Sequence, residues 1–407
     1  MVFAALQGWT PRQKHVVTAS YLGWALDALD FFLLVFVLKD VAAEFHTDIR
    51  TVSIAVTLTL AARPFGAFLF GRLADSYGRR PILMLNIAVY SLLSFSTAFV
   101  PDLATFLVVR TAFGIGMGGV WGIGSSLAME TIRPESRGVV SGLLQSGYSS
   151  GYLLASVVFG LLYVHVGWRG MFMTGILPAL LLIPYVYAKV PESPAFDSAS
   201  SLSKPSIFSI LRRHWKLTTY AIILMTAMNF FSHGTQDFYP TFLQLQHKLS
   251  PGVVGGIAIL YNIGGVLGCL LFGSLSQRFG RRRTMIAAAL LALASVWLWA
   301  YSPTLGLLAS GAFLINLFVQ GCWSIIPAHL NELSPAEARG TFPGTVYQLG
   351  NLVASYNLTL QAWVAARYDS YGLALAAVAI AAALSISALL YVGPEAHSVD
   401  MRMTPEA

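Results

Sequence analysis

The 407-residue chain is 56% hydrophobic and only 11% charged, whereas a soluble domain carries about 25% charged residues. A chain this apolar has too little polar surface to coat a soluble globule, so we expect a membrane protein. Its net charge of +7 comes from short basic clusters between apolar runs, which indicates membrane topology and argues against a nucleic-acid partner. Cys269 and Cys322 both lie inside apolar runs, which argues against a disulfide or a metal site.

Twelve apolar segments are each long enough to cross a bilayer, which requires about 20 mostly apolar residues. An even number of spans places both termini on one side. Of the 25 Lys and Arg residues, 18 fall in the termini and loops of that side and five in the loops of the other. Because basic loops stay in the cytoplasm, we expect cytoplasmic termini and a plasma or inner membrane. The expected spans are 15–38, 52–73, 81–100, 104–128, 139–165, 169–189, 217–243, 253–276, 284–302, 305–328, 341–365 and 372–392.

Three charged residues interrupt the first two expected spans. Asp27 and Asp30 are three residues apart and share one face of a helix, and Arg63 lies near mid-span. A charged group at this depth needs a partner or a cavity. The planar Arg63 guanidinium can hold a carboxylate through two hydrogen bonds. We therefore expect Arg63 to anchor a substrate carboxylate and at least one aspartate to carry a proton; the alternative is a permanent ion pair between them.

The loop after the second span carries two glycines, an aspartate and paired arginines in the pattern Gly-Arg-Leu-Ala-Asp-x-x-Gly-Arg-Arg. This pattern resembles the signature between helices 2 and 3 of the major facilitator superfamily. The glycines allow tight turns, and the arginines can pair with acids at a cytoplasmic gate. Residues 110–119 and 190–194 resemble two further patterns of the superfamily, and Arg110 is expected to be structural. The expected gate residues are Gly71, Asp75, Gly78, Arg79, Arg80, Glu130, Gly273, Gly280 and Arg281.

The chain repeats itself with an offset of 202 residues, and the loop at 71–80 recurs at 273–282. Glu130 and Glu332 are related by the same offset. Two six-helix halves around a central site are typical of transporters that work by alternating access. We expect an all-α membrane protein with twelve transmembrane helices in two six-helix bundles, the major facilitator fold. The expected organisation is an N-terminal bundle at 1–190, a Ser- and Pro-rich linker at 191–216 and a C-terminal bundle at 217–407.

The expected seventh span is unusually polar. Asn229, His233 and Asp237 are four residues apart and share one helical face, with Gln236 beside it. Ionisable residues inside a span usually face a cavity, so this face indicates a permeation or binding route. The alternative is hydrogen bonding that packs helices together. Other polar or aromatic candidates for the cavity are Trp121, Gln145, Tyr148, Asn316, Gln320, Trp323, Gln348 and Asn351.

Residues 229–241 follow the pattern Asn-x-x-Ser-His-x-Thr-Gln-Asp-x-x-x-Thr. This is similar to the helix 7 signature of the Jen-type lactate and pyruvate proton symporters, which belong with the sialate:proton symporters. Residues 24–32 and 62–66 also resemble that family. The resemblance implies uptake of short monocarboxylates with a proton. The expected substrate-binding residues are Arg63, Asn229, His233 and Gln236, and the expected proton-coupling residues are Asp27, Asp30 and Asp237.

The expected function is proton-coupled symport of lactate or pyruvate by alternating access. Symport of a sialate or an aromatic acid is the alternative of the same class, and an intramembrane enzyme or a receptor without transport is a rival of another class. We do not expect an enzyme, because the chain lacks the His-Glu-x-x-His pattern of metalloproteases. No cofactor is expected. The expected partners are a small organic acid anion, a proton and the lipid bilayer, and a monomer is expected.

Overall fold

The computed structural model describes residues 8–47, 49–194, 196 and 207–395, and these form helices joined by loops, with no strand among them. Short 3-10 helices η1 (Thr97–Phe99), η2 (Pro134–Ser136) and η3 (Ala336–Ala338) lie in the connections. The helices are α2 (Pro11–Glu44), α3 (Ile49–Tyr77), α4 (Arg79–Ser96), α5 (Leu103–Thr131), α6 (Arg137–Thr174), α7 (Ile176–Lys189), α9 (Ile207–Arg213), α10 (Trp215–Gln236), α11 (Tyr239–Leu245), α12 (Pro251–Phe279), α13 (Arg281–Ala300), α14 (Leu305–Trp323), α15 (Ile326–Leu333), α16 (Phe342–Ala354), α17 (Asn357–Tyr368) and α18 (Tyr371–Val392).

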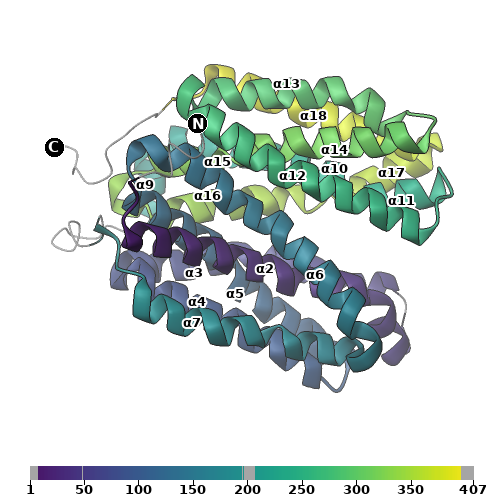
Figure 1. Cartoon of the computed structure of the whole chain (residues 1–407), viewed down its shortest axis with the longest axis horizontal. Coiled ribbons are helices and arrows are strands. Elements are labelled where there is room, and N and C mark those ends of the chain that lie inside the picture. Colours follow the sequence, from purple (N-terminus) through teal and green to yellow (C-terminus); the bar gives the residue numbers. More distant parts are fainter. Residues whose placement is uncertain (1–7, 48, 195, 197–206, 396–407) are drawn as a thin grey trace.

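The helices form two groups that lie side by side (Figure 1). Helices α2 to α7 make up the first, N-terminal group or half, and helices α10 to α18 make up the second group or half. Helices α6 and α12 run along the boundary between the groups, where a Cβ atom on Gly142 would come within 2.3 Å of the Cys269 carbonyl oxygen. The all-α prediction is confirmed for the described residues. The predicted bundle boundaries at residues 190 and 217 stay predictions, and residues 195 and 197–206 of the expected linker lie outside the described residues.

Within the described ranges, nine helices are long and apolar enough to cross a bilayer. They correspond to nine of the twelve expected spans. The other three expected spans coincide with α6, with α10 and α11, and with α16 and α17. The seventh and eleventh expected spans are each divided into two helices, because α10 ends at Gln236 and α16 ends at Ala354. These interrupted helices carry most of the polar candidates of the second half.

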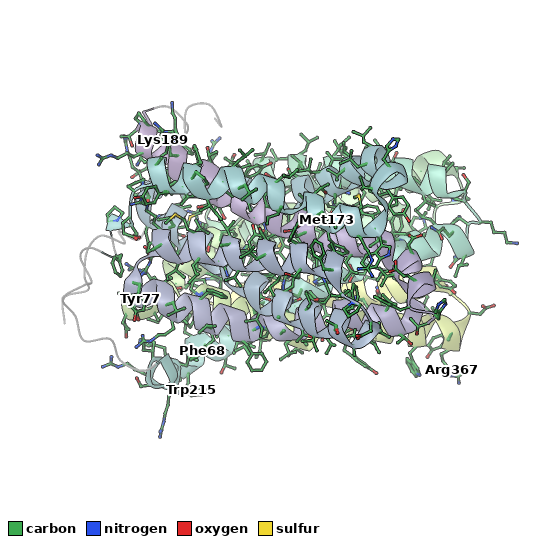
Figure 2. The ribbon with its side chains drawn as sticks, turned by 90° about the horizontal axis from the view of Figure 1, so that it is seen from below. Phe68, Tyr77, Met173, Lys189, Trp215 and Arg367 are labelled. Atoms are coloured by element: carbon green, nitrogen blue, oxygen red, sulfur yellow. The ribbon has the colours of Figure 1, made fainter. Side chains whose placement is uncertain are left out.

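The exterior of the bundle is apolar and its interior contains many polar side chains. Leu181, Trp297 and Phe65 are each more than 70% exposed, and Figure 2 shows the side chains that project from the ribbon, among them Phe68 and Met173. Monomeric soluble proteins rarely expose contiguous apolar patches of such extent. The exterior is therefore suited to contact with lipid chains.

Two ends of the molecule can be distinguished. Tyr77, Lys189 and Trp215 lie at one end, and Arg367 lies at the opposite end (Figure 2). We call the end with Tyr77, Lys189 and Trp215 the linker end and the other the far end. The paired arginines of the repeated loop, which begin α4 and α13, also lie at the linker end.

Glycines of both α3 and α5 allow these two helices to pack closely. A Cβ atom on Gly118 would lie 2.0 Å from the Arg63 carbonyl oxygen, and one on Gly66 would lie 1.8 Å from the Ile115 carbonyl oxygen. Neither position has room for a larger side chain, so the backbones can approach only because both residues are glycine. This close packing fixes the position of Arg63 within the N-terminal group of helices.

Candidate functional site

Arg63 of α3 and Asp27 of α2 form a buried ion pair. The Arg63 Nη2 atom lies 3.3 Å from Asp27 Oδ2, and the two side chains are 5% and 0% exposed. Among the described residues, Arg63 Nε and Asp27 Oδ1 have no hydrogen-bond partner. The pair therefore uses one donor and one acceptor and leaves further hydrogen-bonding capacity on both groups.

Residues of the second group of helices approach Arg63 from the opposite side. Tyr347 of α16 and His233 of α10 both lie within electrostatic range of Arg63. Tyr148 of α6, in the first group, is close to both Arg63 and Gln236 of the second group. Arg63 thus lies where the two groups of helices face each other, which is the position expected for a central binding site.

The polar face of α10 lies beside this site. His233 Nδ1 and Asp237 Oδ2 are 3.0 Å apart, as their spacing of one helical turn predicts. Their side chains are 16% and 33% exposed. Asn229 is buried, and its Nδ2 donates to the carbonyl of Met225 on its own helix at 2.7 Å. In this conformation the Asn229 amide N–H group is therefore directed along the helix.

Asp30 occupies a different environment from Asp27, although the two share a face of α2. Its Oδ1 accepts a hydrogen bond from Ser94 at 3.1 Å, and it lies within electrostatic range of Arg110. The Arg110 guanidinium lies 4.0 Å from the Phe113 ring centroid, a distance typical of a cation–π contact. Asp30 and Arg110 are therefore buried inside the N-terminal group, and the predicted structural role of Arg110 stays a prediction.

Several of the other polar candidates pair with neighbours near the centre. Trp121 Nε1 donates to Gln145 at 3.4 Å, and Trp323 Nε1 donates to the Met228 carbonyl at 2.9 Å. Gln320 Nε2 reaches Ser232 at 3.5 Å. The remaining pairs are Asn316 with the Tyr261 carbonyl, and Asn351 with Gln348. All of these contacts except that of Asn351 with Gln348, which lies within α16, join two helices, as the packing alternative also predicts.

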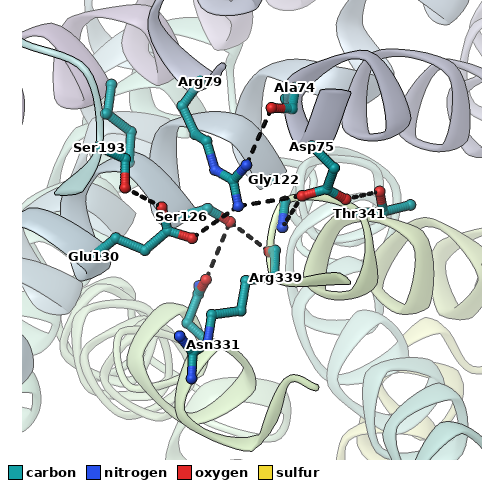
Figure 3. Close-up of polar contacts among 12 residues, drawn as sticks. Ala74, Asp75, Arg79, Gly122, Ser126, Glu130, Ser193, Asn331, Arg339 and Thr341 are labelled. Carbon is teal, nitrogen blue, oxygen red and sulfur yellow. Dashed lines mark hydrogen bonds and ion pairs between the residues drawn. The ribbon is translucent and has the colours of Figure 1, made fainter. Parts of the chain in front are cut away.

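The predicted gate residues meet at the linker end (Figure 3). Arg79 Nη2 lies 3.0 Å from Glu130 and 3.2 Å from Asp75. Asp75 also reaches the second group of helices, because its carboxylate accepts from the backbone N–H of Gly340 at 2.9 Å and from the Thr341 hydroxyl. The predicted pairing of Arg79 with Glu130 is present, and Asp75 joins the two groups.

The second copy of the loop makes the reciprocal contact. Arg281 donates to both oxygens of Glu332, at 2.9 and 3.0 Å. Gln277, which the offset relates to Asp75, accepts from the backbone N–H of Gly138 at 3.0 Å. Gly138 is in turn the counterpart of Gly340. Each loop copy therefore binds the opposite half at equivalent positions, and this closes the linker end.

The glycines of the two loops have distinct backbone roles. Gly78 and Gly280 have φ values of +104° and +90°, which L-residues with side chains rarely adopt. Gly71 and Gly273 face the opposite half, where a Cβ atom would lie 2.9 Å from Thr341 Cα and 2.7 Å from the Gly138 carbonyl oxygen. The first pair permits the turn and the second permits contact between the halves.

Acidic residues after the last helix of each half hold these turns in place. Glu192 accepts from the backbone N–H of Arg79 at 2.9 Å, and Glu395 accepts from that of Arg282 at 3.1 Å. Burial raises the pKa of Glu192 above its usual value, and the backbone donors of Ser193 and Arg79 oppose that shift. Arg80 donates to the carbonyl of Tyr187. The paired arginines are thus tied to the end of α7 in the first half.

Exposure increases from the centre towards the C-terminal end of α10. Asp27 and Arg63 are 0% and 5% exposed in their side chains, whereas Asp237 is 33% exposed. The reciprocal contacts of Asp75 and Gln277 hold the halves together at the linker end. The structure is therefore closed at the linker end.

Sequence reasoning did not identify five residues that contribute here. Tyr347 lies one residue before a named candidate, and its hydroxyl group inside an apolar run was a usable signal. The offset of 202 would also have related Gln277 to Asp75. Ser126, Asn331 and Thr341 bridge the halves, and nothing in their local sequence marks them.

Comparison with models of known protein families identifies the family of this chain. A family model described as Major Facilitator Superfamily matches residues 21–250, and a model described as Sugar (and other) transporter matches residues 216–396. The chain belongs to the Major Facilitator Superfamily. It is therefore an integral membrane protein of a transporter family, and its relatives are transporters rather than enzymes.

Individual relatives extend along almost the whole chain. A putative metabolite transport protein of Haemophilus influenzae is 30% identical over 95% of this chain and 96% of the relative. A carboxylic acid transporter protein homolog of Saccharomyces cerevisiae is 27% identical over 86% of this chain and 61% of the relative. A sialic acid transporter of Escherichia coli is 25% identical over 94% of both chains. The structure of the proton:xylose symporter XylE matches with a TM-score of 0.77, 16% identity and coverage of 96% and 98%, which shows a shared fold.

Proposed function

We propose that the protein is a proton-coupled symporter of short monocarboxylates, with lactate and pyruvate as the first candidates. It would work by alternating access in a plasma or inner membrane, as a monomer, with both termini and the linker end in the cytoplasm. The observation that carries the proposal is the Arg63–Asp27 pair, buried between the two groups of helices with Arg63 Nε and Asp27 Oδ1 left without partners in the described chain.

The pair supports coupling of substrate and proton, because Asp27 and the substrate carboxylate would compete for the same cation, Arg63. An unprotonated Asp27 holds Arg63 through the 3.3 Å contact. Protonation of Asp27 removes its charge and releases the guanidinium to bind a substrate carboxylate, for which Arg has bidentate geometry. Substrate and proton then bind together, and each favours the other. Release of the proton restores the ion pair and displaces the substrate.

Helix α10 would complete the site from the opposite half. Asn229, His233 and Gln236 supply neutral donors, and Asp237 fixes the orientation of the His233 ring through the 3.0 Å contact. A substrate held by Arg63 on one side and by these donors on the other bridges the halves. Its binding therefore favours the conformation in which they close around it.

The names of two relatives support an organic acid as substrate, since one is a carboxylic acid transporter homolog and another a sialic acid transporter. A specific observation favours a second candidate of the same class. Aromatic rings gather beside Arg63: the Trp121 and Tyr347 centroids are 4.7 Å apart, and those of Trp24 and Tyr148 are 5.6 Å apart. Such rings can stack on a planar acid, so an aromatic acid is the alternative substrate.

Counterflow uptake separates these candidates. Purified protein in liposomes preloaded with unlabelled acid is given labelled lactate, pyruvate, a sialate and benzoate in parallel. The proposal predicts accumulation of lactate and pyruvate above the other two. Preference for benzoate or the sialate would assign the alternative substrate, and the absence of counterflow for all four acids would refute the proposal.

A further inference from the structure

A small, partly open pocket lies between α2, α5 and α6 in the first half of the chain. Its walls include Ser20, Trp24, Trp121 and Ser125. The free space in the pocket has room for about one water-sized group. This is close to the smallest space that can hold a water molecule. Ser125 accepts a hydrogen bond from Asn331 of the other half at 3.3 Å, so the pocket adjoins a contact that closes the linker end.

Two hydrogen-bond donors in the pocket wall have no partner among the described residues: Ser20 Oγ and Trp24 Nε1. The residues are 3% and 4% exposed, so water outside the protein does not satisfy them. The neighbouring donors are occupied, because Trp121 Nε1 binds Gln145 and Ser125 Oγ binds the Gly122 carbonyl. A buried donor without a partner costs about 1–3 kcal/mol. The two free donors therefore indicate a pocket built to receive an acceptor.

The pocket shares helix α2 with Asp27, the ion-pair partner of Arg63. Trp24 precedes Asp27 by about one helical turn on α2. Its ring stacks on Tyr148, with centroids 5.6 Å apart, and Tyr148 lies close to Arg63 and Gln236. Trp24 and Tyr148 therefore connect the pocket with the surroundings of Arg63.

We propose that Ser20 and Trp24 form a subsite for the 2-oxygen of a 2-hydroxy or 2-oxo monocarboxylate whose carboxylate is bound by Arg63. This proposal rests on the proposed function. An indole N–H can only donate, so the occupant must present an acceptor. The serine hydroxyl can donate to a keto oxygen or accept from a hydroxyl, so both oxidation states fit. A second carboxylate does not fit, because the pocket has room for about one oxygen and its described walls carry no cation.

The test compares lactate with propionate, which lacks only the 2-oxygen. Proteoliposomes containing the unmodified protein, Trp24→Phe or Ser20→Ala are assayed for the KM of lactate, pyruvate and propionate. Trp24→Phe removes the N–H and keeps an aromatic ring, and Ser20→Ala removes only the hydroxyl. Trp299→Phe is the matched control, because Trp299 Nε1 is also buried without a partner in the described chain but lies in α13 of the other half.

The unmodified protein should favour lactate and pyruvate over propionate. Each pocket variant should raise the KM of both oxygenated acids about 3- to 10-fold, as for one lost hydrogen bond, and leave that of propionate unchanged; Trp299→Phe should preserve the preference. The subsite would be overturned if the unmodified protein had equal affinity for lactate and propionate, or if the pocket variants affected all three acids equally. The pocket would then hold only a structural water, and the transport proposal would remain. Failure of the unmodified protein to take up any of the three acids would overturn both proposals.

Discussion

Arg63 and Asp27 share a single 3.3 Å contact although both are buried and both have hydrogen-bonding atoms to spare. A purely structural buried pair is most stable when its remaining donors and acceptors are satisfied. Here Arg63 Nε and Asp27 Oδ1 are left without partners in the described chain, at the boundary between the halves. This arrangement is the basis for our proposal that Arg63 binds the substrate carboxylate and Asp27 carries the proton.

Replacing Arg63 should abolish measurable binding. Arg63→Lys keeps the charge and loses the bidentate geometry, and Arg63→Ala loses both. Removing a buried charged contact costs about 2–5 kcal/mol, so lactate affinity should fall by at least about 30-fold in both variants. Binding to purified protein by isothermal calorimetry measures this. Arg169→Lys, at a partly exposed ion pair with Glu44, should bind normally. Normal lactate affinity in Arg63→Ala would rule out the carboxylate anchor.

Asparagine at position 27 or 30 should separate binding from coupling. Asn mimics a permanently protonated aspartate, so exchange of substrate across the membrane continues while uphill accumulation is lost. We expect this behaviour from at least one variant, and first from Asp27→Asn, because Asp27 contacts Arg63 while Asp30 contacts Ser94. Exchange and pH-driven uptake are measured on the same proteoliposomes. If both variants still accumulate lactate, the proton site lies elsewhere, and α10 is the next candidate.

Asn229→Ala should weaken lactate binding by about 1–3 kcal/mol, the cost of a lost buried hydrogen bond. Asn229 Nδ2 now donates within its own helix and would reorient to reach the substrate. Asn262→Ala is the matched control, since its Nδ2 makes the same bond to the Ala258 carbonyl in α12. Equal affinities for the two variants would show that Asn229 only packs helices.

His233 and Asp237 should affect different kinetic constants. His233→Ala removes a donor at the site and should weaken binding more than Asn229→Ala, with a shifted pH optimum. Asp237→Asn keeps the geometry of the 3.0 Å contact but loses control of the ring's tautomer, so it should mainly lower turnover. Measuring KM and kcat of uptake across pH tests both. Unchanged pH profiles in both variants would assign this pair to structure.

Asp75→Ala should open the linker end. The substitution removes the acceptor of the Gly340 N–H and of the Thr341 hydroxyl, while Glu130 still holds Arg79. Loss of hydrogen bonds to a charged acceptor is worth about 1.5–3 kcal/mol each. A cysteine introduced by Ser126→Cys, with Cys269 and Cys322 replaced by alanine, should therefore react faster with a thiol reagent. Asp102→Ala removes an N-cap away from the gate and should not accelerate labelling. Equal rates in both variants would contradict the gate assignment.

The sequence predicted what depends on local spacing and on the repeat. The His233–Asp237 contact follows from one turn of helix, and the Arg79–Glu130 pair follows from a loop motif present twice. The sequence did not separate Asp27 from Asp30, because a shared helical face does not tell which neighbouring helix each residue meets. Tyr347 and the pocket at Trp24 depend on how helices from distant parts of the chain pack, which periodicity alone does not determine.

The central claim is that an acid gradient drives uptake of a monocarboxylate through Arg63 and Asp27. Its most direct test uses proteoliposomes with a neutral interior and an external pH about two units lower. The account predicts that labelled lactate accumulates above its external concentration, that a protonophore abolishes the accumulation, and that Arg63→Ala vesicles do not accumulate it. Uptake that is the same with and without the pH gradient would contradict proton coupling and the role assigned to the Arg63–Asp27 pair.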